Sequence, residues 1–517
     1  MRSIRVRILA IFAVLVIAGV GAWQLLPSGD ADEKPVTVGT SDEVTSLDPA
    51  GAYDAGSWAL YSNIYQSLMT FKSGAVVPEP DAAESCRFIG QKLQTYQCEL
   101  RDDLTFSNGH KITAKAVKYS FDRMIKIASD VGPASLFPTL ENVVTEGRLI
   151  TFNLNARDAT FPHKLATGAG SIVDPEEYPA DKLRTGDRAD GSGPYTLKSY
   201  KAGEEAELVP NPGYQGAIRK SGGPVTIRYY ADSEKLKSGW DTGQVDVTHR
   251  QLPPETLNKL NPGDPDIRVT EMDSAEIRNM AFNVRADSAF ADKRVRQAAA
   301  WIIDRGPLVG DVYKSTVEPL YSLIPQGTIG HGTPFFDAYP SPDPAKAKDL
   351  MADAGIETPL KVTYGFSPGG ATVAEAAEIR RQLEASGLFK VTVKPMEWQD
   401  FQKAYAAGQF DFYTVGWLPD YPDPDTFSQP LVGRTNTLHN GYASAEMDAL
   451  ITKTLEFSDR SRTSATFKDL QDLVGEDVPL LPLWQKKDYV IAKTDVAGSQ
   501  YLSDGTGIWR LWELGWI

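Results

Sequence analysis

The sequence predicts an α/β fold in which helices cover a mixed sheet. Residues 360–364 and 391–393 are rich in β-branched and aromatic residues, which is typical of strands. Residues 374–386 lie between them and favour a helix, which completes a strand-helix-strand unit. The chain has 517 residues, of which 42% are hydrophobic, so we expect about three domain-sized units with a substantial core.

Other stretches add elements to this fold in chain order. Residues 36–39 predict a strand, and the apolar positions 61, 64, 65 and 68 then follow the spacing of one helix face. Thr113 can cap the next helix, whose inward face is formed by positions 117, 121 and 124. Positions 295, 298, 299, 302 and 303 form another apolar stripe after Asp292.

The N-terminal segment predicts export. Arginines occupy positions 2, 5 and 7, and residues 8–26 then contain no charged side chain. As a helix this run would span about 29 Å, enough to cross a bilayer core, with its N-terminus in the cytoplasm. Residues 1–27 are therefore an uncleaved anchor or a signal segment, with a possible cleavage site at Val20-Gly21-Ala22. No cysteine follows for lipid attachment, and residues 28–34 are a polar linker.

The cysteine pair predicts one disulfide. Cys86 and Cys98 are the only cysteines, and the residues between them favour a hairpin with Gly90 in its turn. In an oxidising compartment, we expect the two thiols to be bonded.

Composition and motif searches exclude several functions. The net charge of −15 argues against nucleic acid as a partner. The five histidines are not at metal-ligand spacing, so we expect no metal site, and the glycine-rich pieces lack the features of phosphate loops. No nucleophile motif occurs, and we expect neither a cofactor nor enzymatic activity. Because carboxylates are numerous, an exported hydrolase with paired carboxylates remains a remote alternative.

A proline-rich run near the C-terminus predicts the binding site. Residues 410–415 favour a strand, and Gly416 to Phe427 then contains prolines at 419, 422 and 424, which exclude a helix. Trp417 and Asp420 thus lie where a strand ends and a stiff loop begins. Ligands of open α/β sheets bind at such ends, where a tryptophan offers a flat apolar surface and an aspartate a partner for an amine.

These residues resemble a known family. The run resembles the Gly-Trp-x-x-Asp-Tyr-x-Asp-Pro segment of family 5 extracellular solute-binding proteins, the peptide receptors of ABC importers. Five more stretches are similar to family motifs and occur in the same order: 104–117, 191–195, 211–214, 282–305 and 344–355.

The resemblance implies a two-lobed periplasmic-binding-protein-like fold (type II, cluster C) with an extra inserted domain. Lobe I would comprise residues 35–75, 190–275 and 482–517. The extra domain would comprise residues 76–189 and contain the cysteine hairpin, and lobe II would comprise residues 276–481. Ligand would lie between the lobes, which close around it.

The resemblance also implies roles for individual residues. Asp420 lies where peptide-binding members pair a carboxylate with the ligand α-amine. The main chains of Gly416 and Leu418 would pair with an extended ligand beside Trp417, and Tyr53 and Ala55 would contribute main chain from the other lobe. Thr414 departs from relatives that carry an arginine there for the ligand carboxylate.

We therefore expect a monomeric receptor that delivers a peptide-like solute to the permease subunits of an ABC transporter. It would act outside the cytoplasm, either tethered to the membrane by its N-terminal segment or released after cleavage. An oligosaccharide ligand is the alternative, because an aromatic surface serves a sugar as well as a peptide. Nickel complexes are disfavoured by the absence of a histidine cluster.

Overall fold

The computed structural model describes residues 34–517 except 220–221, 250–251 and 504–506. The predicted anchor or signal segment 1–27, and all of the predicted linker 28–34 except Lys34, lie outside the described residues. Among the helices that are described, none has the length and apolar character needed to cross a membrane.

One mixed sheet runs through the described chain. Its strand order is β15-β14-β16-β12-β17-β11-β1-β10-β9-β8, with β13 paired to β17. In that order, the strands are Phe389–Pro395, Leu360–Phe366, Phe412–Trp417, Ile267–Phe282, Leu480–Lys493, Val247–His249, Val36–Thr40, Val225–Tyr229, Glu205–Pro210 and Tyr195–Lys201, and β13 is Val317–Pro319.

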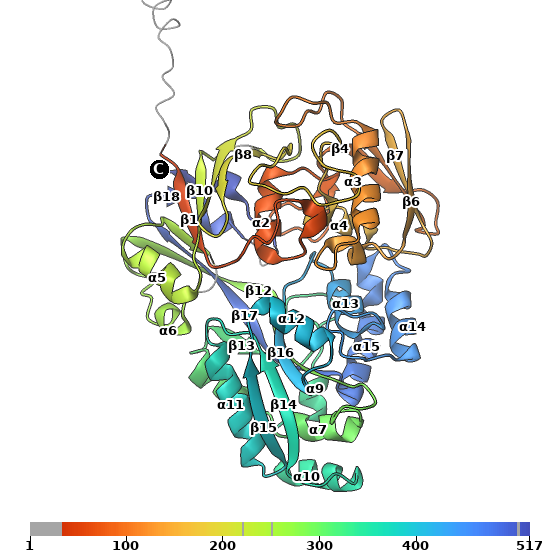
Figure 1. The fold of residues 1–517 in the computed structure, drawn as a ribbon, viewed down its shortest axis with the longest axis vertical. Helices are drawn as coiled ribbons and strands as arrows, with labels where there is room; N and C mark the ends of the chain where they lie inside the picture. The colour runs from red at the N-terminus through yellow and green to blue at the C-terminus, as the bar shows by residue number, and fades with distance from the viewer. Residues whose placement is uncertain (1–33, 220–221, 250–251, 504–506) are drawn as a thin grey trace, which may run out of the picture. The chain divides into compact units, whose positions relative to one another are not determined.

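Two long strands connect the halves of this sheet. β12 has 16 residues and β17 has 14, and they pair antiparallel in the middle of the order. On one side of them lie strands from residues 360–417, and on the other side strands from residues 36–249. The two groups form the two lobes of the chain, one with β1, β8 and β10 and one with β14, β15 and β16 (Figure 1).

Each lobe has its own hydrophobic core. One core gathers buried residues between Val36 and Val247 and again between Val490 and Leu514, and Tyr421 of the other lobe also joins it. The second core gathers buried residues from Ile277 to Trp484. Since two cores are joined by two continuous strands, the fold is the two-lobed type II arrangement, in which the strands between the lobes can act as a hinge.

A second sheet of four strands lies within the extra domain, in the order β4-β5-β7-β6. Its strands are Ala83–Phe88, Thr95–Leu100, Leu149–Leu154 and Leu140–Glu146, and helix α3 (Ala114–Ile127) packs on it (Figure 1). The Thr113 hydroxyl accepts a hydrogen bond from the main-chain N–H of Ala116 and so caps α3 as predicted. A disulfide joins Cys86 to Cys98 across the β4–β5 hairpin.

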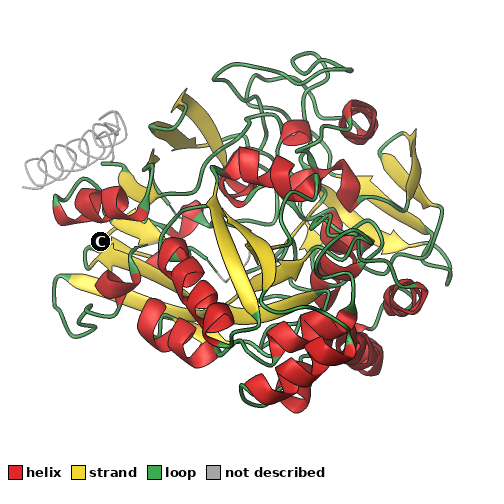
Figure 2. Ribbon diagram, turned by 60° about the horizontal axis from the view of Figure 1, so that its bottom comes forward, coloured by secondary structure: helices red, strands yellow, loops and turns green. Residues whose placement is uncertain are grey.

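Helices flank the strands (Figure 2). Those of eight residues or more are α2 (Ala55–Ile64), α3, α5 (Ser233–Asp241), α7 (Lys293–Ala300), α10 (Pro344–Asp353), α11 (Thr372–Ala385), α12 (Trp398–Ala406), α14 (Ala445–Thr454) and α15 (Ser464–Asp477). The shorter turns are η1 (Pro49–Gly51), η2 (Pro133–Leu136), α4 (Phe161–Lys164), η3 (Gly168–Gly170), α6 (Pro254–Leu257), α8 (Arg305–Pro307), η4 (Leu308–Val312), α9 (Pro334–Ala338), η5 (Pro424–Phe427), α13 (Gln429–Val432), η6 (Arg460–Thr463), η7 (Ser499–Tyr501) and η8 (Leu511–Glu513). Short strand pairs are β2 (Met69–Thr70) with β3 (Glu79–Pro80) and β18 (Val496–Ala497) with β19 (Gly515–Trp516).

The strand-helix-strand unit β14-α11-β15 is confirmed, and its two strands are parallel neighbours. Several element boundaries differ from the prediction. Helix α7 ends at Ala300, so positions 302 and 303 of the predicted apolar stripe lie beyond it. Helix α2 ends at Ile64, because Tyr65 is extended and its hydroxyl bonds the main-chain oxygen of Leu47. The strand expected over residues 410–415 is β16 at Phe412–Trp417, because its ends are set by pairing with β12.

Candidate functional site

The end of β16 and the loop after it form a self-bonded unit. Trp417 is the last residue of β16, and its indole N–H donates to the main-chain oxygen of Thr426 at 2.8 Å. The Thr426 hydroxyl oxygen in turn accepts from the main-chain N–H of Asp420 at 2.9 Å. Residues 417–426 therefore fold back on themselves, and the Trp417 ring and the Asp420 carboxyl are fixed by bonds as well as by the prolines.

Asp420 contacts the opposite lobe directly. The hydroxyl of Tyr53, from the segment that leads into α2, donates to Asp420 Oδ2 at 2.8 Å. The Thr426 hydroxyl donates to the same oxygen at 3.2 Å. The Tyr53 ring stacks on Trp58 of α2, with centroids 5.1 Å apart and planes inclined by 22°. Two residues predicted to face each other from different lobes are thus joined by one hydrogen bond.

The environment of Asp420 disfavours its ionised form. Burial raises the pKa of Asp420 to about 7, although the hydrogen bonds from Tyr53 and Thr426 oppose this shift. Lys164 also acts on Asp420 electrostatically, but its ammonium is bonded to Asp158 at 2.7 Å. Asp420 is partly buried and lines a pocket, so a cation that entered this pocket would restore its charged form.

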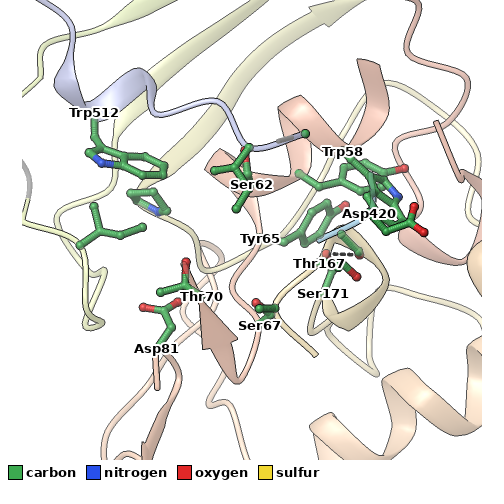
Figure 3. Close-up of a pocket in the computed structure, with 17 residues that line it drawn as sticks. Trp58, Ser62, Tyr65, Ser67, Thr70, Asp81, Thr167, Ser171, Asp420 and Trp512 are labelled. Carbon is green, nitrogen blue, oxygen red and sulfur yellow. Dashed lines mark hydrogen bonds between the residues drawn. The ribbon is translucent and has the colours of Figure 1, made fainter. Parts of the chain in front are cut away.

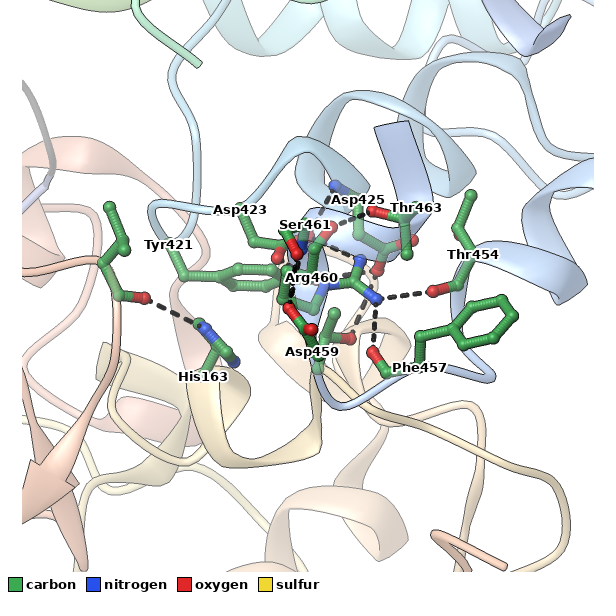
Figure 4. A network of polar contacts seen from close by, with 12 residues as sticks. His163, Tyr421, Asp423, Asp425, Thr454, Phe457, Asp459, Arg460, Ser461 and Thr463 are labelled. Carbon is green, nitrogen blue, oxygen red and sulfur yellow. Dashed lines mark hydrogen bonds and ion pairs between the residues drawn. The ribbon is translucent and has the colours of Figure 1, made fainter. Parts of the chain in front are cut away.

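A network of buried charges holds the loop after Asp420 (Figure 4). The guanidinium of Arg460 binds both oxygens of Asp423, at 2.6 and 2.8 Å. The Tyr421 hydroxyl donates to Asp425 at 3.0 Å, and burial raises the pKa of Asp425. Such a bidentate pair fixes orientation as well as charge, so Arg460 positions the loop of the site.

The same network reaches the extra domain. Burial would raise the pKa of Asp158, but the charge and hydrogen bond of Lys164 hold it below its usual range. The Thr160 hydroxyl lies 2.8 Å from Asp158 and 3.3 Å from Asp425, so the two acids share one hydroxyl across the interface between lobe II and the extra domain.

The pocket beside Asp420 is lined chiefly by lobe I and the extra domain (Figure 3). Trp58, Ser62 and Tyr65 come from α2 and the residue after it, and Thr167 and Ser171 come from the segment around η3. Asp81, which follows β3, contributes a second carboxylate. The pocket therefore combines aromatic rings, hydroxyl groups and two acids.

The other predicted residues occupy distinct positions. Leu418 is partly buried just after β16, and Gly416 pairs with Arg278 of β12. A Cβ at Gly416 would be in ordinary van der Waals contact with Glu276 and Ile277, each at 3.8 Å, so a small side chain would fit there. Ala55 is the first residue of α2, where main-chain N–H groups have no acceptor within the helix, and the pairing of its main chain with a ligand stays a prediction.

The hydroxyl of Thr414 is hydrogen-bonded to side chains of the two adjacent strands, β14 and β12. Its hydroxyl oxygen lies 2.9 Å from the Tyr364 hydroxyl and accepts from Arg278 at 3.0 Å. Arg278 is itself paired with Glu375 at 2.9 Å. A cation thus lies beside Thr414, although it comes from β12.

Sequence reasoning missed most of the pocket wall. Trp58, Asp81 and Trp512 line it, yet 454 positions separate the first from the last. Trp58 and Asp81 precede the predicted helix and the extra-domain hairpin, and nothing in their local sequence marks them as lining residues. Only the tertiary packing of lobe I, its C-terminal segment and the extra domain brings them together.

A family model confirms the family. The model of bacterial extracellular solute-binding proteins, family 5, matches residues 77–438. The chain therefore belongs to this family of solute-binding proteins, in agreement with its two-lobed fold.

Relatives of known name extend over nearly the whole chain. A probable D,D-dipeptide-binding periplasmic protein of Escherichia coli is 26% identical over 485 residues, covering 90% of each chain. A dipeptide-binding protein of Bacillus subtilis is 24% identical over 480 residues, covering 87% of each. Among solved structures, a periplasmic binding protein of Helicobacter pylori in complex with the peptide STSA superposes with a TM-score of 0.82 at 22% identity, covering 94% of this chain and 98% of the other.

Proposed function

We propose that the protein is an extracytoplasmic receptor that captures peptides between its two lobes and delivers them to the permease of an ABC importer. The observation that carries this proposal is the Asp420 carboxyl, which borders a pocket, is bonded across the lobes to Tyr53 and has a raised pKa. The names of the relatives, which are dipeptide-binding proteins, support the same ligand class.

The α-amine of a peptide suits Asp420. An ammonium enclosed between closed lobes loses its water, and a fixed carboxylate replaces that water. A hydrogen bond to a charged group stabilises the complex by about 1.5–3 kcal/mol. Removing one partner of a buried ion pair costs about 3–5 kcal/mol, because the other charge is left buried without a partner. In return the ammonium would favour the ionised form of Asp420, so the acid and the ligand neutralise each other.

The edge of β16 suits the main chain of a peptide. Within the described residues, β14 pairs with β16 at Phe412 and Tyr413 and no further along the strand. Beyond these pairs Thr414 and Val415 are buried, whereas Gly416 and Trp417 are partly exposed and paired only with β12 among the described strands, so their other edge suits an extended ligand. The Trp417 ring, held by its bond to Thr426, offers the first side chain of the peptide an apolar surface.

Calorimetric titration with a free tripeptide and its N-acetylated form tests the proposal. The wild type is expected to bind the free peptide and to bind the acetylated one poorly. Asp420→Asn is expected to weaken the free peptide by at least about tenfold, since about 1.4 kcal/mol is one decade, and to lose much of the discrimination.

Trp417→Ala is the matched control. It removes the apolar ring of Trp417 and keeps the Asp420 carboxylate, so it should weaken the binding of free and acetylated peptides alike. Equal binding of both peptides to the wild type would overturn the role of Asp420 and favour the oligosaccharide alternative.

The receptor is expected to release its ligand without any chemical change to the ligand. Mass spectrometry of a peptide incubated with a stoichiometric amount of protein should recover it intact. Steady release of fragments would instead favour the exported hydrolase. We further propose that the receptor acts as a monomer outside the cytoplasm, and that residues 1–27 hold it at the membrane or direct its export.

A further inference from the structure

The pocket next to Asp420 continues to a second buried acid. Figure 3 shows Asp420 and Asp81 on opposite sides of the pocket, with Ser67, Thr167 and Ser171 between them. Asp81 is 4% exposed and comes from the segment between β3 and β4. A ligand whose amine is held by Asp420 can therefore extend towards a further carboxylate.

The hydroxyl groups between the two acids present acceptors. Ser67 donates its proton to the main-chain oxygen of Met69 at 2.6 Å. Thr167 and Ser171 donate theirs to the main-chain oxygens of Lys164 and Gly168, at 2.8 and 2.7 Å. A hydroxyl has one proton to donate and two lone pairs, and one of those of Thr167 already accepts from the main-chain N–H of Ala169. Towards the pocket these side chains therefore offer the lone pairs that remain.

Ser62 differs from them, because its hydroxyl donates to the main-chain oxygen of Ala59 at 2.9 Å while its oxygen already accepts from Asn63 and from the main-chain N–H of Trp509. The aromatic rings of Trp58, Tyr65 and Trp512 complete the wall, and the faces of such rings attract cations. Among the described residues that line this pocket, none is a lysine, arginine or histidine. Its chemistry therefore favours a ligand group that donates hydrogen bonds and carries positive charge.

Asp81 is held by uncharged hydrogen-bond donors, and the charge of Arg101 acts on it without a hydrogen bond to the carboxylate. Its Oδ1 accepts from the Tyr214 hydroxyl at 2.5 Å and from the main-chain N–H of Ala217 at 2.8 Å. Arg101 donates to the main-chain oxygen of Asp81, at 2.7 Å, rather than to its carboxylate. Burial raises the pKa of Asp81 to about 6, although the bonds from Tyr214, Ala217 and Gln66 oppose it. A carboxylate accepts about four hydrogen bonds, so one more donor can be accommodated.

We propose that this pocket is a subsite for a second cationic group of the ligand, with Asp81 as its counter-charge, so that the receptor prefers peptides whose N-terminal residue is basic. The inference rests on the proposed peptide function, since it uses Asp420 for the α-amine. The subsite then selects lysine or arginine side chains over neutral side chains of the same length.

Titration with two tripeptides that differ in one group tests the subsite. Lys-Ala-Ala and norleucyl-Ala-Ala have side chains of similar length, but only the first carries a second ammonium. The wild type is expected to bind the lysine peptide about tenfold more tightly. Asp81→Asn is expected to abolish this preference while leaving the affinity for the norleucine peptide within about threefold, because Asn can still accept from Tyr214 and Ala217.

Tyr214→Phe is the matched control. It removes a hydrogen bond to Asp81 and keeps the carboxylate, so the preference for the lysine peptide should persist. If Tyr214→Phe loses the preference as fully as Asp81→Asn, the effect is structural and the subsite is refuted. Equal binding of both peptides to the wild type also refutes the subsite while leaving peptide binding intact. If neither peptide binds, or if acetylation of their amines has no effect, the proposed function itself fails.

Discussion

Replacing Asp420 by asparagine should stabilise the protein while it weakens ligand binding. The pKa of this carboxyl is raised from 3.8 to about 7 in the folded protein. The folded protein then holds the proton more tightly than the unfolded chain does. The group therefore favours folding fully below about pH 4, and that contribution is lost as the pH rises to about 7. An asparagine carries no charge at any of these pH values and avoids the loss.

The expected magnitude follows from the shift. A difference of about three pKa units corresponds to about 4 kcal/mol, at about 1.4 kcal/mol per unit. Because part of the Asp420 side chain faces the pocket, water there reduces this figure, and we expect Asp420→Asn to gain about 1–3 kcal/mol at pH 8. At pH 4.5 the wild-type carboxyl is largely protonated when folded, so the gain should be small. The amide oxygen can still accept from Tyr53.

Chemical unfolding of wild type and variant, without ligand, at pH 4.5 and pH 8 measures this difference. Asp158→Asn is the matched control, because Asp158 is a buried acid of the same network whose pKa is lowered. Removing it leaves Lys164 without its partner, and we expect a loss of about 3–5 kcal/mol at pH 8. Two neighbouring acids should thus respond with opposite sign.

One result would refute the reasoning about Asp420. If Asp420→Asn is destabilised by the same amount at both pH values, then the ionised carboxyl is not disfavoured in the folded protein. Its role as a partner for an ammonium would then lose its physical basis. If the Asp420→Asn variant is stabilised but binds peptide as well as the wild type, then the ionised carboxyl destabilises the folded protein without taking part in peptide recognition.

Three further predictions concern other parts of the chain. Thiol titration of denatured, unreduced protein from outside the cytoplasm should find no free thiol, and two free thiols would exclude the bond between Cys86 and Cys98. Tyr53→Phe should weaken peptide binding by a factor of about 3 to 10, because Asp420 loses one of its hydrogen bonds, and unchanged affinity by calorimetry would count against that contact. A chain beginning at Glu33 should be soluble and bind ligand like the whole chain, whereas misfolding, seen by circular dichroism, would make the N-terminal segment part of the fold.

Local sequence predicted the elements whose causes are local. Thr113 caps α3 and Asp292 caps α7, each with its side-chain oxygen on a nearby main-chain N–H. The unit β14-α11-β15 could be recognised from β-branched and helix-favouring stretches of ordinary length. Prolines in the run from Gly416 to Phe427 excluded a helix, because each fixes φ and removes a donor.

Element ends followed from partners distant in sequence. β16 begins at Phe412 because that residue pairs with Phe282 of β12. α2 stops at Ile64 although the apolar spacing continues, since Tyr65 turns away to reach Leu47 and Tyr178. Such contacts outweigh local preference, which amounts to a fraction of a kcal/mol per residue.

The sequence by itself determined the family, the order of the motifs and the prediction that Trp417 and Asp420 bind the ligand, because short runs of neighbouring residues carry this information. The tertiary structure decided that Tyr53 reaches Asp420 across 367 positions. It also decided that Asp81 shares a pocket with Asp420 and that Arg460 holds the loop. The reason is physical: the charge state of a buried acid depends on burial and on partners that only the folded chain brings within hydrogen-bond distance.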